Sequence, residues 1–245
     1  MAGLSALRVF ESPAELTPAA ADEIVTAAQQ AVAERGRFTW ALSGGSTPRG
    51  LYRLLASDAW RDRLPWHAIH FFWSDERHVP PDHPESNYRM AREAMLDAVP
   101  VPPENVHRIR AEEPDAHRAA AEYEATLEDW PSFDLSLLGL GKDGHTASLF
   151  PGSPAIHERE RLVVAPWVES LRSFRITFTP PMLNHARRTV FLVSGEEKAE
   201  ALHAVFEGGR IEGERQPDTY PAQVVEGNVL WMVDRAAARL LKSAV

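Results

Sequence analysis

Short apolar runs that alternate with helix-like segments are the feature of this sequence that most restricts its fold. Such runs lie at Phe38–Leu42, Ile69–Trp73 and Thr189–Val193, and each continues into polar residues and then a segment with helical spacing. Strands that alternate with helices form a mostly parallel sheet covered by helices on both faces. The sequence therefore predicts an α/β protein with a single-domain, Rossmann-like, three-layer fold. Because no linker, low-complexity tract or repeat interrupts the chain, we expect residues 1–245 to form one domain.

The same reasoning assigns the remaining elements. Thr17 and Pro18 are typical of a helix start, and Gly36 is typical of a helix end. Further strands are expected at Leu7–Phe10, Val106–Ile109, Phe133–Leu138, Leu162–Ala165, Arg175–Thr179 and Asn228–Val233, and further helices at Asn87–Leu96, Pro114–Glu128 and Asp234–Leu241.

The most informative loop follows the apolar run at Phe133–Leu138. The glycines at 139, 141 and 144 allow a tight turn, and Asp143 and His145 lie within that turn. A titratable imidazole beside a carboxylate at the end of a strand indicates a general base. The glycines also fit the dinucleotide-binding pattern, but Pro151 and Gly152 leave no room for the long helix which that motif needs. A purely structural histidine that caps a turn is the other interpretation of His145.

Two more strands end in residues that suit ligand binding. Ser43-Gly-Gly-Ser-Thr-Pro48 follows Phe38–Leu42, offers backbone N–H groups and hydroxyls, and has Pro48 at the expected start of a helix, which favours an anion. It is not a P-loop, because the Gly-Lys-Ser/Thr ending is absent, and an ordinary strand–helix turn is the alternative. Ser74-Asp75-Glu76-Arg77 follows Ile69–Trp73. Since ligands of open α/β sheets bind at the carboxyl ends of strands, we expect one site built from these loops.

Composition excludes several classes of function. The chain has no cysteine, which excludes disulfides, thiolate catalysis and cysteine metal sites. None of its ten histidines has metal-type spacing, so we expect no metal. A net charge of −9 argues against nucleic acid as a partner. We see neither a secretory signal nor a long apolar stretch, and expect a cytoplasmic protein without a membrane span, either a monomer or a weak homodimer.

With these motifs in place, the chain resembles the 6-phosphogluconolactonases along essentially its whole length. The segments that carry the resemblance are LSGGSTPRGLY, FFWSDERHVPPDHPESNY, FDLSLLGLGKDGHTASLFPG, RITFTPPMLN, LVSGEEKAEAL and the WMVDRAAA ending. The resemblance implies hydrolysis of 6-phospho-D-glucono-1,5-lactone to 6-phosphogluconate, the second step of the oxidative pentose phosphate pathway. It also implies that no metal or organic cofactor is needed.

The residue types suit that reaction. A δ-lactone is an activated ester, so an oriented water, a base and stabilisation of the oxyanion suffice. His145 is the expected base, Asp143 or Asp75 would hold its tautomer, and Arg77 would stabilise charge at the carbonyl or hold the sugar. A phosphate or substrate cluster would comprise Ser43, Gly44, Gly45, Thr47, Arg175 and Lys198.

Two alternative functions stay open at this point. Glucosamine-6-phosphate deaminases look related to this family and carry a catalytic glutamate shortly after the Asp-Gly-His motif. Here Thr146-Ala-Ser-Leu-Phe150 offers no carboxylate, and Arg77 stands where the deaminases prefer tyrosine. The other alternative is a non-catalytic sugar-phosphate sensor, which would bind the same ligand without turnover.

Overall fold

The computed structural model describes residues 6–208, 210–211 and 214–242. Six strands form one sheet in the order β1-β12-β9-β5-β2-β3, and every neighbouring pair in it is parallel. The expected α/β fold with a mostly parallel sheet is therefore confirmed. The bounds of these strands are Ala6–Phe10 for β1, Phe38–Leu42 for β2, Ile69–Trp73 for β3, Leu135–Leu138 for β5, Thr189–Val193 for β9 and Val229–Asp234 for β12.

A smaller antiparallel sheet lies beside the main one. It joins β4 (Asp75–Arg77), β8 (Ser173–Phe178) and β6 (Val163–Val164), with β7 (Trp167–Val168) also paired to β8. A further hairpin pairs β10 (Arg210–Ile211) with β11 (Glu214–Arg215). The antiparallel sheet matters for function because β4, which directly follows β3, pairs with β8 in it.

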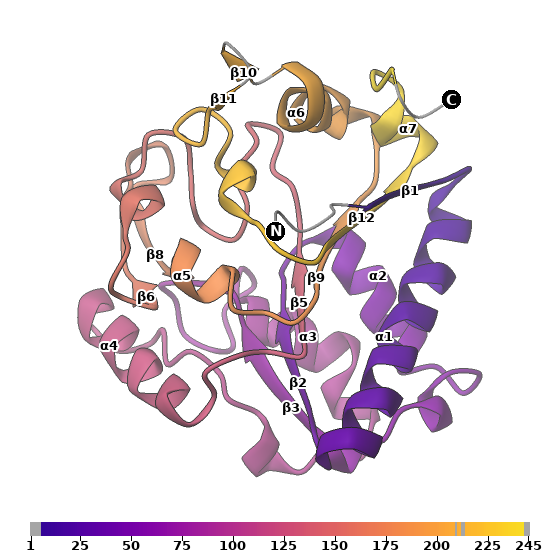
Figure 1. Ribbon diagram of the computed structural model, residues 1–245. Coiled ribbons are helices and arrows are strands. Elements are labelled where there is room, and N and C mark those ends of the chain that lie inside the picture. Colours follow the sequence, from indigo (N-terminus) through magenta and orange to yellow (C-terminus); the bar gives the residue numbers. More distant parts are fainter. Residues whose placement is uncertain (1–5, 209, 212–213, 243–245) are drawn as a thin grey trace.

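Helices cover both faces of the main sheet (Figure 1). Helices α1 and α2 lie on one side, whereas α4 and α5 lie on the other side together with β6 and β8. The bounds are Pro13–Arg35 for α1, Ser46–Leu55 for α2, Asn87–Ala94 for α3, Ala116–Thr126 for α4, Pro180–Leu183 for α5, Ala199–His203 for α6 and Arg235–Ala238 for α7. None of the helices among the described residues is long and apolar enough to cross a membrane.

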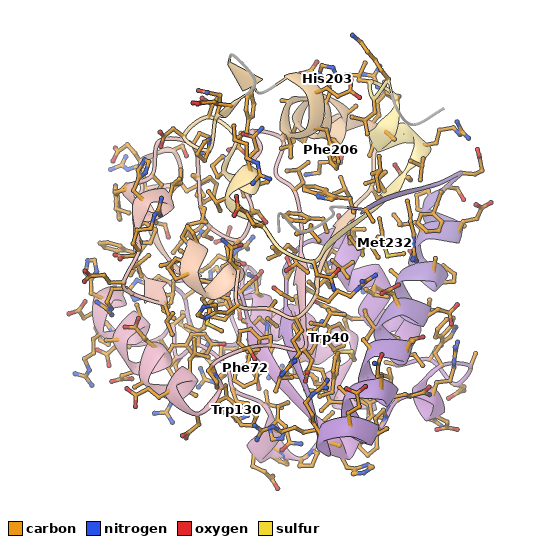
Figure 2. All side chains as sticks on the ribbon, viewed as in Figure 1. Trp40, Phe72, Trp130, His203, Phe206 and Met232 are labelled. Atoms are coloured by element: carbon orange, nitrogen blue, oxygen red, sulfur yellow. The ribbon has the colours of Figure 1, made fainter. Side chains whose placement is uncertain are left out.

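Aromatic side chains fill the space between the sheet and its helices (Figure 2). On one side Tyr52 of α2 meets Trp40 of β2 edge-on, with ring centroids 5.9 Å apart. Elsewhere Phe178 stacks on both Phe133 and Tyr123, at 5.5 and 6.0 Å. Burial of a large apolar side chain contributes about 1.5–3 kcal/mol, so these contacts hold the layers together.

Several sequence-based boundaries differ from the structure, and three of the differences concern helix starts and the edge of the sheet. Helix α1 begins at Pro13 rather than Pro18, because Pro13 takes the first helical position and Pro18 is accommodated inside the helix. Helix α2 begins at Ser46, so Pro48 lies within its first turn. The expected strand at Val106–Ile109 is reduced to an isolated bridge between Val106 and Phe71, after which the chain leaves the sheet edge.

A histidine pair at this sheet edge generates a prediction about stability. His70 Nδ1 lies 3.2 Å from His107 Nε2, and both rings pack against Trp130. Burial lowers the pKa of both imidazoles, helped by the charge of Arg37 at His70 and of His70 at His107. A histidine with a lowered pKa stabilises the fold above its unfolded pKa, and this stabilisation is lost as pH falls. The melting temperature should therefore drop on acidification from about pH 7 to pH 5.

Replacement of one partner should weaken that dependence. His107→Gln removes one titrating group, so its melting temperature should change less with pH over the same range. The exposed His67 provides a matched control, and His67→Gln should keep the slope of the wild type. Equal slopes in wild type and His107→Gln would contradict the assignment.

Candidate active site

The carboxyl ends of β2, β3, β5 and β9 surround one pocket of about 490 Å³. From β2 the chain runs to β3 on one side, whereas β5 pairs with β2 on the other side. The order of the strands along the chain therefore reverses at β2. At a reversal of this kind the neighbouring loops leave the sheet in opposite directions, which opens a crevice for a ligand. The lining residues are Ser43, Gly44, Gly45, Asp75, Arg77, Asn87, Gly139, Leu140, Gly141, Lys142, Asp143, His145, Ala147 and Lys198.

The loop after β2 presents backbone N–H groups to the pocket. The Ser43 N–H donates to the Tyr52 hydroxyl (3.0 Å), which in turn donates to the Ser43 carbonyl (2.9 Å), so the loop is fixed to α2. Gly45 has φ 102°, a conformation that favours glycine, and α2 begins directly after it. Among the described residues nothing accepts from the N–H of Gly44 or Gly45. N–H groups at a helix N-terminus form a site for an anion.

Asn87 connects this loop with the loop after β3, and the sequence did not single out its side chain. Its side-chain amide donates to the Asp75 carbonyl at 3.0 Å. Its Oδ1 lies so close to Gly44 that a Cβ on that glycine would come within 2.0 Å of it. Asn87 is the first residue of α3, distant in sequence from both loops, so no local pattern could indicate its place in the pocket.

His145 and Asp143 form a hydrogen-bonded pair in the loop after β5. Asp143 Oδ1 lies 2.6 Å from His145 Nδ1 and also accepts the His145 backbone N–H at 3.2 Å. The His145 ring packs on Phe150, with centroids 4.4 Å apart. A Cβ on Gly141 would come within 2.1 Å of His145 Nδ1, so only glycine lets the imidazole lie against this turn.

The charge of Asp143 determines which nitrogen of His145 is available. Burial opposes ionisation of Asp143, but the hydrogen bonds and charge of His145 outweigh it and lower the pKa of the carboxyl below its ordinary value. An ionised carboxylate only accepts hydrogen bonds, so His145 Nδ1 carries the proton. In a neutral imidazole Nε2 is then the unprotonated nitrogen; it has no partner among the described residues, which suits it to accept a proton.

Asp75 is buried beneath the pocket and bonds to Ser148 instead of His145. Ser148 Oγ donates to Asp75 Oδ2 at 2.7 Å, and the Asn87 amide approaches Oδ1 at 3.5 Å. Ala147, just before Ser148, has φ 47°, a left-handed conformation that costs a non-glycine residue about 1–3 kcal/mol. Of the two carboxylates considered for orienting the imidazole, Asp143 is the one in contact with it.

Cations lie on two sides of the pocket. Arg77 on β4 lies opposite Arg175 in the antiparallel register of β4 with β8. Burial, together with the charge of Arg77, lowers the pKa of Arg175. Lys198 follows β9 and is half-buried; burial lowers its pKa, and Lys142 adds to the effect. None of these four cations forms an ion pair within the part of the chain that the structure describes. Unpaired cations in a pocket are a typical anion site.

Two expected ligand residues are not in the pocket wall. Thr47 lies in the first turn of α2, behind the Gly44–Gly45 segment. Arg175 is buried, and its Nη1 donates to Ser173 Oγ (2.8 Å) and to the Phe174 carbonyl (3.1 Å). The structure brings the other expected residues together, and it adds Asn87 and Lys142. No group of three or more potential metal ligands exists among the described residues, and metal independence stays a prediction.

Comparison with known proteins agrees with this arrangement. The family model for glucosamine-6-phosphate isomerases/6-phosphogluconolactonase matches residues 11–231. A 6-phosphogluconolactonase of Synechocystis is 44% identical over 229 residues, which cover 89% of this chain and 91% of that protein.

Solved structures share the fold over nearly the whole chain. The 6-phosphogluconolactonase from Trypanosoma brucei superposes with a TM-score of 0.85 at 29% identity, covering 98% of this chain and 99% of that one. A monomeric glucosamine-6-phosphate deaminase superposes with a TM-score of 0.82, covering 96% and 99%. Its identity is 22%, so that likeness concerns the fold alone.

The close approach of Gly141 to His145 generates a prediction. Gly141→Ala should displace the imidazole and break its hydrogen bond to Asp143, because no room exists for the added methyl group. Proton NMR measures this directly, since the strongly hydrogen-bonded Nδ1 proton should give a downfield resonance that the variant lacks.

Gly50 in α2 is the matched control. A Cβ there meets nothing within 4 Å, so Gly50→Ala should leave the resonance in place. It should also stabilise the helix by about 1 kcal/mol, the usual difference between glycine and alanine. Retention of the resonance in Gly141→Ala would show that the imidazole does not depend on this glycine.

Proposed function

Because the chain belongs to the family of glucosamine-6-phosphate isomerases and 6-phosphogluconolactonases, we propose that it hydrolyses 6-phospho-D-glucono-1,5-lactone to 6-phospho-D-gluconate. The observation that carries this proposal is the Asp143–His145 pair, in which Asp143 takes up Nδ1 of an imidazole that lines a pocket with unpaired cations. That combination suits attack of water on the carbonyl of an anionic, phosphorylated substrate.

His145 acts as the general base in the proposed mechanism. Its Nε2 takes a proton from a water molecule as the water oxygen forms a bond to C1 of the lactone. Asp143 holds the Nδ1 proton and stabilises the imidazolium that results. The tetrahedral intermediate then collapses, the bond between C1 and the ring oxygen breaks, and the ring oxygen takes the proton back. The open chain then carries a carboxylic acid, which releases the second proton of the water to solvent and becomes the carboxylate.

Arg77 is the group we assign to the developing negative charge. It lines the same pocket as His145, and its Nη1 is held by the Glu85 carbonyl at 2.7 Å. A fixed cation near the oxyanion stabilises the transition state more than the neutral ground state. Asp75 also lines this pocket as a buried carboxylate, and Ser148 holds it in place.

The phosphate group is assigned to the cluster around the loop after β2. Ser43, Gly44 and Gly45 contribute donors, and Lys198 contributes a half-buried ammonium group. Arg175 adds positive potential from behind the wall. Binding the phosphate away from the reacting carbonyl orients the ring, which is how enzymes use remote binding energy.

The pocket favours the lactonase over the deaminase alternative. Its lining carboxylates are Asp75 and Asp143, and each already accepts a hydrogen bond from a neighbouring side chain. No glutamate lines it within the described part of the chain, so the additional carboxylate of the deaminases has no counterpart here. We also retain the expectations of a cytoplasmic enzyme, monomeric or weakly dimeric, with no nucleic-acid partner; the net charge of −9 supports the last of these.

A coupled assay tests the function. Freshly made lactone is added to the purified protein, and 6-phosphogluconate is followed against the spontaneous rate of hydrolysis. Turnover well above that rate is expected. Binding of the lactone without turnover would identify a sensor, and release of ammonia from glucosamine 6-phosphate would identify a deaminase.

The role of His145 generates the first functional prediction. His145→Ala should lower turnover by roughly 10²–10⁴-fold, the usual contribution of a positioned base, while the affinity for product changes little. In the wild type, activity should fall in acid, because a protonated imidazole cannot accept a proton. Near-normal turnover in a folded His145→Ala protein would rule out the general-base role.

The second functional prediction concerns Lys198. Lys198→Ala should weaken recognition of the phosphorylated lactone by about 1.5–3 kcal/mol, the scale of a charged hydrogen bond. Hydrolysis of unphosphorylated gluconolactone should change much less. The measurement is the ratio of kcat/KM for the two lactones, with the exposed Lys242→Ala as control. An unchanged ratio would move the phosphate-binding role to Arg77 or Arg89.

A further inference from the structure

A buried carboxylate beside the pocket takes no part in the mechanism above. Glu76 is 2% exposed and does not line the pocket. Its Oε1 accepts the backbone N–H groups of Arg77 (2.8 Å) and Asn87 (2.7 Å). Its Oε2 accepts the Tyr88 backbone N–H (2.8 Å) and the Ser86 hydroxyl (3.0 Å). Every donor therefore belongs to the segment that directly follows Glu76 or to the start of α3.

These hydrogen bonds close a loop at both of its ends. The loop leaves β4 at Arg77 and returns at Ser86 and Asn87, where α3 begins. Both loop ends supply a pocket residue, because Arg77 and Asn87 line the site. The Arg77 guanidinium is in turn held by the carbonyl of Glu85, within the same loop. The carboxylate of Glu76 therefore sets the distance between the two pocket residues.

We propose that Glu76 is a positioning residue for lactone hydrolysis: it holds Arg77 and Asn87 at the pocket by binding both ends of the loop that joins them. This inference rests on the proposed function. Arg77 needs a fixed position because the benefit of a cation at an oxyanion depends on geometry set before the reaction. A shift of about 1 Å in such a group costs on the order of 10²-fold in rate.

Only a carboxylate satisfies all of these donors at once. In Glu76→Gln one oxygen becomes an NH₂ group, which faces at least one backbone N–H and cannot accept from it. An amide group at the Oε1 position loses the bonds from both Arg77 and Asn87, and one at the Oε2 position loses the bond from Tyr88; the size of the side chain is unchanged in both cases. Burial raises the pKa of Glu76, but the hydrogen bonds oppose this rise and favour the ionised form.

A purely structural role is the alternative, because Glu76 also caps α3. It accepts from the first two N–H groups of that helix, and Ser86 Oγ accepts from the third, that of Arg89. Loss of a helix cap lowers stability but does not by itself change the rate of the folded protein. The two roles are therefore separated by kinetics measured well below the melting temperature.

The test is a double-mutant cycle with Arg77. Glu76→Gln should lower kcat/KM for the phosphorylated lactone roughly tenfold to a hundredfold. In an Arg77→Ala background the same substitution should lower it by less than about threefold, because residues that act through one group are not additive. Glu76→Asp retains the charge but is shorter, and should fall between wild type and Glu76→Gln in rate.

Asp134 provides the matched control. It is a poorly exposed carboxylate that accepts from the Thr39 N–H (2.8 Å) and hydroxyl (3.0 Å), but it precedes β5 and so lies at the end of the sheet away from the pocket. Asp134→Asn should lower the melting temperature without changing kcat/KM.

Two results would overturn the inference: full activity of folded Glu76→Gln, or losses that simply add in the double mutant. If Glu76→Gln does not fold, the cycle is run with Glu76→Asp and the same criteria apply. A wild-type protein that fails to hydrolyse the lactone would refute the proposed function itself. If the wild type hydrolyses the lactone and Glu76→Gln has the same kcat/KM, only the role of Glu76 is refuted.

Discussion

The parallel pairing of β2 with β3 on one side and with β5 on the other decides where every pocket residue lies. Parallel strands place their carboxyl ends at one edge of the sheet, and the reversal of strand order at β2 separates the loops there. The loop after β2, the β4 segment and the Asp143–His145 turn reach a common pocket for this reason. Without that reversal, the same loops would pack against each other and leave no crevice.

The electrostatics of the pocket differ from those of the whole chain. The net charge is −9, yet the pocket collects Arg77, Lys142 and Lys198, with Arg175 behind them and no ion pair to any of them among the described residues. Most other arginines of the described structure pair with carboxylates at the surface, where such pairs contribute little to stability. Leaving cations unpaired costs stability, and the phosphorylated ligand that we propose for this pocket would recover it on binding.

Buried carboxylates organise the loops around this sheet. Glu76 binds the loop between β4 and α3, and Asp134 binds the start of β2. Asp234 accepts from Ser194 Oγ at 2.6 Å and from the backbone N–H of Gly195 and Ala237, so it fixes the segment that leads to Lys198. Such hydrogen bonds are individually modest, but each carboxylate left without its donors would be costly. Glu76 and Asp234 therefore fix the two segments that lead to Arg77 and Lys198.

The sequence by itself determined the α/β class, the main strands and most of the residues that line the pocket, because apolar periodicity and glycine-rich loops are local signals. His145 beside Asp143 could be found in this way. The absence of the expected strand at Val106–Ile109 could not be predicted from the sequence, because strand formation depends on the edge that it pairs with. Here only Val106 pairs, with Phe71. Asn87 and Glu76 could not be identified from the sequence either. Asn87 contacts a segment distant in sequence, and the hydrogen bonds of Glu76 depend on its burial. Only the tertiary structure decided that Asp75 bonds to Ser148 rather than to the imidazole, because that depends on how the loops after β3 and β5 meet in space.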